Sequence, residues 1–295
     1  MYTIENVKQL EASNILLVHD TDCDGMCGRT ILMNELGSRI TGTRPASFRS
    51  RETISAASVA AYDAVIFVDC SPSLEELAFC KEVGPVVVLD HHFNADGEHI
   101  LDNESVLPAI CASDECGASL AWYWCYLNED LPEVVEYVRD RDLWLHQLPY
   151  TKEVNTAIYN HHLTSTWDKI LVMSRKNLRA EGDTLLRSQQ ARVKLLSNNA
   201  VALNDVVYVN SPTDISDLGN YLLKQTPEAK FAASYYMVGS KNARVSLRSR
   251  LASECDVGVI ARKLGGGGHP CAGSLQCSVE ELPAVLKSFT EVGYV

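Results

Sequence analysis

The sequence predicts an α/β protein with an N-terminal, doubly wound parallel sheet, a connecting helix and a smaller C-terminal α/β domain. Three short apolar runs, at residues 15–18, 64–68 and 86–89, alternate with segments of helical character. Apolar runs of this kind are typical of parallel strands that are buried on both faces. A chain of 295 residues with 46% hydrophobic residues can bury two cores of ordinary size.

Helices are expected after each of these strands. Residues 29–36 follow the first run, and residues 117–127 and 132–139 follow the third. After the second run, Ser71 is expected to cap a helix that has Pro72 in its first turn. Helical connections of this kind keep successive strands parallel.

A long helix is expected at residues 171–196, although Gly182 weakens this prediction. In the second domain, strands are expected at residues 206–209, 231–238, 244–250 and 274–277, and helices at residues 215–224, 257–264 and 279–289. The predicted boundaries are residues 1–170 for the first domain, 171–200 for the helical linker and 201–295 for the second domain.

Composition excludes several classes of protein. No apolar run approaches the length of a bilayer span, so a membrane protein is excluded. The N-terminal residues lack the basic start and apolar run of a signal peptide. The ten cysteines form no CxxC pair, which fits reduced thiols in a cytoplasmic protein. The net charge of −12 disfavours non-specific coating of nucleic acid.

Acidic residues follow the first apolar run at every second position. In HDTDCDG, the side chains of Asp20, Asp22 and Asp24 share one face if the segment is extended. Crowded carboxylates repel one another unless cations neutralise them. A calcium loop would need Glu at its twelfth position, which is Ile31 here. A metal site is therefore expected, with a solvated acidic turn as the alternative.

Polar groups also end the other two runs. Asp69 follows the second run, and Asp90, His91 and His92 follow the third. The carboxyl ends of parallel strands meet at one edge of the sheet, where ligands bind. Carboxylate and imidazole ligands without thiolate suit manganese or magnesium better than structural zinc. Two divalent ions bridged by a carboxylate are typical of enzymes that hydrolyse phosphate esters.

The C-terminal part carries local positive charge and a run of glycines. Six basic and two acidic residues lie between residues 238 and 263. Arg244, Arg248 and Arg250 are expected on one strand face, where they would form a phosphate-binding row. The segment GGGGHPCAGS lacks the ending of a P-loop. Its backbone N–H groups and His269 are expected to approach an anion, with a flexible loop as the alternative.

The sequence resembles the DHH phosphoesterases with their DHH-associated C-terminal domain. The motifs that carry the resemblance are, in this order, DTDCDG, the Asp69 strand, the DHH triplet, the Asp140 region and GGGGH. The resemblance extends from about His19 to Ser274. That family includes single-strand exonucleases, nano-RNases, 3′-phosphoadenosine 5′-phosphate phosphatases and cyclic-dinucleotide phosphodiesterases. The resemblance implies a two-metal phosphoesterase that uses Mn²⁺, or Mg²⁺ in its place.

The resemblance also implies roles for individual residues. The implied metal ligands are Asp20, Asp22, Asp24, Asp69, His91 and Asp140, and Asp69 bridges the two ions. The implied catalytic residues are Asp22, Asp24, Asp69, His91 and His92, of which His92 reaches the substrate phosphate. Asp90 is expected to orient its neighbour. The residues expected to hold the distal part of the substrate are His92, Arg248, Gly267, Gly268 and His269.

The last metal ligand has two candidates. Asp140 and Asp142 both fit the family's spacing beyond the DHH triplet, and Asp140 is expected because it directly follows a helical segment. For Asp142, a helix cap or an ion pair with Arg139 or Arg141 is the structural alternative.

The expected function is manganese-dependent hydrolysis of phosphodiester bonds in short single-stranded RNA or DNA. Hydrolysis of a cyclic dinucleotide or of a nucleotide 3′-phosphate is one alternative, and a catalytically inactive nucleic-acid-binding protein is another. A cytoplasmic protein without a membrane partner is expected, and a homodimer is compatible with the sequence. The sequence leaves open the sugar preference and the direction of attack.

Overall fold

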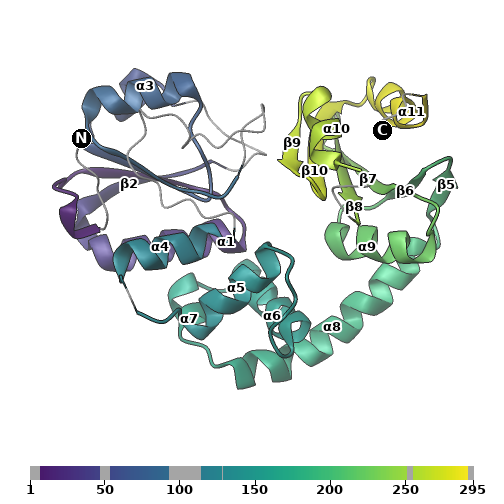
Figure 1. The fold of residues 1–295 in the computed structure, drawn as a ribbon, viewed down its shortest axis with the longest axis horizontal. Coiled ribbons are helices and arrows are strands. Elements are labelled where there is room, and N and C mark those ends of the chain that lie inside the picture. The colour runs from purple at the N-terminus through teal and green to yellow at the C-terminus, as the bar shows by residue number, and fades with distance from the viewer. Residues whose placement is uncertain (1–6, 47–53, 93–113, 128, 251–254, 292–295) are drawn as a thin grey trace. The chain divides into compact units, whose positions relative to one another are not determined.

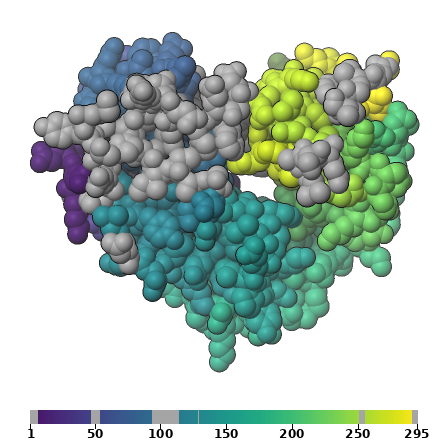
Figure 2. Space-filling view, in the orientation of Figure 1, coloured from purple at the N-terminus to yellow at the C-terminus, as the bar shows by residue number. Residues whose placement is uncertain are grey.

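The computed structural model describes the whole chain except residues 1–6, 47–53, 93–113, 128, 251–254 and 292–295. The chain divides into two compact units, Met1–Leu186 and Arg187–Val295 (Figure 1 and Figure 2). No described helix is both long enough and apolar enough to cross a bilayer.

The first unit contains a four-stranded parallel sheet with the strand order β2-β1-β3-β4. Its strands are β1 (Ile15–His19), β2 (Ile40–Pro45), β3 (Ala64–Val68) and β4 (Val86–Leu89). Every residue of β1, β3 and β4 is buried, which confirms the three strands that the apolar runs predict. The edge strand β2 was not predicted, because its sequence ITGTRP contains no apolar run.

Helices cover both faces of this sheet. The helices of the first unit are α1 (Cys23–Leu36), α2 (Ala56–Val59), α3 (Leu74–Val83), α4 (Gly117–Cys125), α5 (Glu133–Asp142), α6 (Thr151–Thr164) and α7 (Trp167–Leu171), with short 3₁₀ helices at Val7–Gln9 and Gly37–Arg39. Helices α1 and α4 lie on one face of the sheet and α2 and α3 on the other. Helices α5, α6 and α7 pack against α1. Alternate residues along each strand point to opposite faces. Leu17 of β1 therefore joins one core with α1 and α4, while Leu16 joins a second core with α2 and α3 (Figure 1).

The long helix α8 (Arg175–Ser197) corresponds to the expected connecting helix but begins later, because α7 ends at Leu171. The division between the two units falls within α8, between Leu186 and Arg187. The structure explains Gly182, since a Cβ atom there would collide with the backbone carbonyl of Glu153 in α6. This glycine therefore allows close packing of two helices.

The second unit is a six-stranded mixed sheet with the order β5-β6-β7-β8-β10-β9. Its elements are β5 (Val201–Leu203), β6 (Val206–Asn210), α9 (Ile215–Gln225), β7 (Phe231–Val238), β8 (Asn242–Ser249), α10 (Val257–Lys263), β9 (Gly267–His269), β10 (Ala272–Ser278) and α11 (Leu282–Glu291). Val245 and Leu247 of β8 pack in the core with α10 and α11. The opposite face of the sheet, toward α9, carries the alternate residues of β8, and we call it the α9 face (Figure 1).

Candidate metal centre

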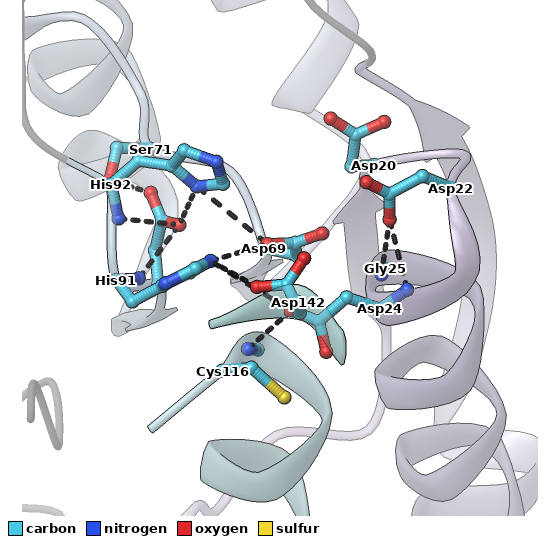
Figure 3. Close-up of polar contacts among 12 residues, drawn as sticks. Asp20, Asp22, Asp24, Gly25, Asp69, Ser71, His91, His92, Cys116 and Asp142 are labelled. Carbon is cyan, nitrogen blue, oxygen red and sulfur yellow. Dashed lines mark hydrogen bonds and ion pairs between the residues drawn. The ribbon is translucent and has the colours of Figure 1, made fainter. Parts of the chain in front are cut away.

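The carboxyl ends of three strands bring acidic and imidazole groups together in the first unit. Asp20 follows β1, Asp69 follows β3, and His91 follows β4 (Figure 3). Ligand atoms of Asp24, Asp69 and His91 lie within 4.8 Å of one another, as do those of Asp20, Asp22 and Asp69. Asp69 belongs to both groups, which is the position that a bridging ligand requires.

The start of α1 arranges the first acidic motif. Asp22 is the N-cap, and its Oδ1 accepts hydrogen bonds from the backbone N–H groups of Asp24 (3.0 Å) and Gly25 (3.1 Å). A Cβ atom at Gly25 would lie 2.5 Å from the carbonyl oxygen of Asp20. The motif therefore needs glycine because helix α1 turns closely against the end of β1.

Asp24 is held by the N-terminus of α4. Its Oδ2 accepts from the backbone N–H of Gly117 at 2.6 Å and its Oδ1 from that of Ala118 at 2.8 Å. The partial positive charge of a helix N-terminus favours a carboxylate there. A Cβ atom at Gly117 would lie 2.6 Å from Cβ of Asp69 and 3.0 Å from Oδ2 of Asp24. Gly117, which the sequence did not single out, therefore permits these two aspartates to meet.

Asp69 has an unusual backbone and an unusual environment. Its φ of 56° is in the left-handed region, which non-glycine residues rarely adopt, and its N–H donates to the carbonyl of Leu89 at 2.9 Å. Its Oδ1 is buried and has no hydrogen-bond donor in the described part of the chain. Burial and the charges of Asp24 and Asp22 raise the pKa of Asp69 well above its ordinary value. A bound cation would satisfy this oxygen and neutralise the cluster.

Asp90 orients the two histidines of the DHH triplet. Its Oδ1 accepts from the backbone N–H groups of His91 (2.9 Å) and His92 (3.2 Å) and from Nδ1 of His92 (2.7 Å). Its Oδ2 accepts from the hydroxyl of Ser71 at 2.6 Å. Burial opposes ionisation of Asp90, but the charges of both histidines and the hydrogen bonds from His92 and Ser71 together outweigh it and hold the pKa of Asp90 below its usual range. Burial likewise lowers the pKa of His92, but the charge and hydrogen bond of Asp90, with the charges of Asp142 and Asp22, together raise it to about 10.

Ser71 is not the helix cap that the sequence predicts. The N-cap of α3 is Ser73, whose hydroxyl accepts from the backbone N–H of Glu76 in a capping box. Pro72 consequently precedes the helix rather than opening it, and the hydroxyl of Ser71 is directed to Asp90 instead.

His91 lies among the carboxylates. Its Nε2 is 3.3 Å from Oδ2 of Asp142 and 3.4 Å from Oδ1 of Asp69. Burial and the positive charge of His92 lower the pKa of His91, which favours the neutral imidazole that binds metals. Burial and the charge of Asp24 raise the pKa of Asp142. The same crowding of carboxylates that surrounds Asp69 thus extends to Asp142.

The expected ligand Asp140 does not join this cluster. Its Oδ1 accepts from the backbone N–H of Gln147 at 2.8 Å, and its Oδ2 accepts from the hydroxyl of Thr151. Two residues apart on a helix, the side chains of Asp140 and Asp142 point about 200° apart, so only one can face His91. The structure places Asp142 there and uses Asp140 to hold the segment that follows α5.

The segment that follows α5 contains two bulky residues in the left-handed region, Trp144 at φ 58° and His146 at φ 51°. Backbone N–H groups of Leu145 and His146 donate to the carbonyl of Asp140 at 2.9 and 3.3 Å. The guanidinium of Arg141 lies 4.0 Å from the centre of the Trp144 ring. Asp140 thus holds an unfavourable turn that directly follows Asp142.

In the second unit, the sheet register brings Arg248 and His269 to one face. Ala272 of β10 pairs with Arg248 of β8 on one side and with His269 of β9 on the other. The guanidinium of Arg248 donates to the hydroxyl of Ser216 at 2.9 Å, and Gly219 of α9 packs against its aliphatic stem. The small side chain of Ala272 therefore lies between two groups that can bind an anion.

One expectation for this unit, the place of Arg250, and one alternative, the flexible glycine loop, need correction. Arg250 does not extend a phosphate-binding row, because its guanidinium donates to the carbonyls of Leu223, Thr226 and Ala229. The glycine run is not one open loop, because Gly267 and Gly268 lie in β9. Gly268 has a φ of 135°, and a Cβ atom there would collide with the carbonyl of Ala272. Strand packing thus accounts for this glycine.

The sequence matches the models of two domains. The DHH family N-terminal domain matches residues 14–159, and the DHHA1 domain matches residues 192–292. An uncharacterized protein of Acanthamoeba polyphaga mimivirus is 30% identical over 203 residues, which cover 65% of this chain and 48% of that protein. The chain therefore spans about half the length of this curated relative.

Solved structures show the same fold at low sequence identity. The DHH domain of a member of the s1p family of ribosomal proteins is 16% identical, with a TM-score of 0.60, over 95% of this chain and 87% of that one. RecJ from Thermus thermophilus, solved in complex with Mn²⁺, is 15% identical, with a TM-score of 0.53, over 93% of this chain and 51% of that one. The two matched domains follow each other in the order that the motifs predict and take in most of the sequence, and the chain therefore belongs to the DHH family.

Proposed function

We propose that the protein is a two-metal phosphoesterase that hydrolyses phosphodiester bonds of short single-stranded oligonucleotides. The observation that supports this best is the position of Asp69. It is shared by two groups of potential ligands, and its buried Oδ1 has no hydrogen-bond donor among the described residues. A buried carboxylate oxygen without a hydrogen-bond donor is unfavourable, so this arrangement is suited to cations.

The ligands that we propose are Asp20, Asp22, Asp24, Asp69, His91 and Asp142. This set supplies carboxylate oxygens and one imidazole, which suits Mn²⁺ or Mg²⁺. Cys23 lies within the motif, but burial and the charges of Asp22 and Asp24 raise the pKa of its thiol, so it does not contribute a thiolate. When bound, two such ions neutralise the phosphoryl group and make water a stronger nucleophile at neutral pH.

The remaining groups would bind and orient the substrate. With its pKa raised to about 10, His92 is a cation that can donate a hydrogen bond to a phosphoryl oxygen, and Asp90 fixes its ring through Nδ1. In the DHHA1 domain, Arg248 and His269 would hold a second part of the nucleotide, with Gly267 and Gly268 beside them. Short ligands suit the α9 face of the second unit, because the paired residues of its strands offer a small number of anion-binding groups.

The test is a product ladder from end-labelled RNA and DNA strands of increasing length, incubated with Mn²⁺. We expect preferential cleavage of the shortest strands, and loss of cleavage in Asp69→Asn. Asp168→Asn, which alters an exposed carboxylate of α7, is the matched control and should retain activity. Preferential cleavage of a cyclic dinucleotide or of a nucleotide 3′-phosphate would replace the substrate assignment. Binding without any product would overturn the proposed enzyme.

A further inference from the structure

Arg244 differs from the other arginines in and directly after β8. Arg248 donates to Leu247 and Ser216, and Arg250 donates to one carbonyl in the last turn of α9 and to two carbonyls after it. Arg244 is 5% exposed, and its Nε has no hydrogen-bond acceptor among the residues that the structure describes. A charged group that is buried in this way is unfavourable unless something outside the described chain satisfies it.

The sheet rows around Arg244 on the α9 face contain no acidic residue. Residues that pair directly across neighbouring strands share a face, so the register gives three adjacent rows there: Tyr236, Arg244 and Gln276; Ser234, Ser246 and Ser274; and Ala232, Arg248 and Ala272. These rows hold two guanidinium groups, three serine hydroxyls and no carboxylate. At the start of α9, Asp214 pairs with Arg192 at 2.7 Å and Asp217 accepts a hydrogen bond from Gln189.

Access to these rows is from the β10 side. Ser246 and Ser234 are buried, whereas Ser274 is half-buried and Gln276 is exposed. Serine hydroxyls can donate to an anion, and arginine offers a planar set of donors that matches a phosphate. Arg244 and Arg248 are four positions apart on one strand, so their Cα atoms are separated by about 13 Å. This spacing suits two phosphate groups of one ligand better than a single phosphate.

We propose that Arg244, with the hydroxyls of Ser246 and Ser274, binds a second phosphate group of a short nucleotide whose first phosphate is held at Arg248. The identity of the ligand rests on the proposed function, whereas the anion site itself rests on the geometry of the second unit. Under this proposal, a dinucleotide with a terminal phosphate binds more tightly than the same dinucleotide without one.

The test is calorimetric titration of the full chain in EDTA with pApA, which has two phosphates, and with ApA, which has one. We expect the wild type to bind pApA more tightly than ApA. Arg244→Gln should weaken the affinity for pApA about tenfold, which is the effect of losing a charge-assisted hydrogen bond. The affinity for ApA should change less than about twofold in this variant. Lys241→Gln removes an exposed charge from the preceding turn and should leave both affinities unchanged. Equal losses for pApA and ApA, or no loss for pApA, would overturn the proposal.

A second variant covers the case in which Arg244→Gln folds poorly. Arg244→Met keeps the aliphatic stem and removes the unsatisfied charge, so its melting temperature without ligand should be equal to or above that of the wild type. Inorganic phosphate should raise the melting temperature of Arg244→Met less than that of the wild type, because only the Arg248 site remains. An equal phosphate-induced rise in the two proteins would contradict the site. Because these measurements need no hydrolysis, absence of product from any oligonucleotide would overturn only the proposed function.

Discussion

The metal centre of the first unit gathers negatively charged groups, whereas the α9 face of the second unit gathers positively charged groups. At the metal centre, burial and mutual repulsion raise the pKa values of Asp69 and Asp142. On the α9 face, Arg244 and Arg248 share three rows without a carboxylate. The buried Oδ1 of Asp69 in the first region and the buried Nε of Arg244 in the second have no hydrogen-bond partner among the described residues. Divalent cations would suit the first region and phosphate groups the second, which are the two kinds of ligand that the proposed function requires.

The largest effect is expected for Asp69→Asn, which removes the charge shared by both ligand groups. Hydrolysis should fall by more than about a hundredfold. Mutation of a group that only hydrogen-bonds to a metal ligand already lowers metal affinity or activity by about 10–100-fold. The same change relieves repulsion, so the metal-free variant should melt above the metal-free wild type, by about 2–4 °C per kcal/mol. A hydrolysis assay with Mn²⁺ checks the first statement, and scanning calorimetry in EDTA and in Mn²⁺ checks the second. A variant that melts lower without metal and keeps its stabilisation by Mn²⁺ would contradict the assignment.

The next largest effect separates Asp140, the ligand expected from the sequence, from Asp142, the ligand that we propose. Asp142→Asn should weaken Mn²⁺ binding by about 10–100-fold and leave the metal-free stability equal or higher. Asp140→Asn should instead lower the free energy of unfolding by about 1–3 kcal/mol, because Asp140 is buried and accepts from Gln147 and Thr151. Titration with Mn²⁺ and urea unfolding of both variants provide the comparison. The reverse pattern would restore Asp140 as the ligand.

A smaller effect is expected where α4 approaches the two aspartates. Gly117→Ala would place a methyl group 2.6 Å from Cβ of Asp69, and overpacking of this kind costs about 1–3 kcal/mol. Since Asp69 and Asp24 must move, Mn²⁺ affinity should fall as well. Gly239→Ala is the control, because it adds strain at a φ of 66° with open space around it. If both variants lose stability but keep equal affinity for Mn²⁺, Gly117 has no part in the site.

The sequence predicted those parts of the fold and site that local pattern determines. Strands β1, β3 and β4 were predicted because they are buried on both faces, whereas β2 and β9 were missed because their glycines and polar residues give no strand signal. Asp140 and Asp142 could not be separated by spacing, because the choice depends on the rotation of α5 about its axis. Gly117 was missed because its contact partner Asp24 is 93 positions away.

The smallest expected effect is a pH dependence that has opposite signs with and without metal. A carboxyl group with a raised folded-state pKa binds its proton more tightly in the folded protein than in the unfolded one. Its contribution to stability is therefore lost as pH rises from about 4, the unfolded value, through its folded pKa. Burial and the charge of Asp22 raise the pKa of Asp20 to about 6, and the pKa of Asp69 is also raised.

Buried His91, whose pKa is lowered, opposes this trend below about pH 6.5, so the comparison must be made against Asp69→Asn in the same buffers. In EDTA, we expect the melting temperature of the wild type to fall relative to that of Asp69→Asn between about pH 5 and pH 7.5. With Mn²⁺ the difference should reverse, because deprotonated carboxylates bind the metal and its binding releases protons. Parallel curves for the two proteins under both conditions would mean that Asp69 does not titrate with the cluster. The charge contrast between the two regions would then rest on the arginines alone.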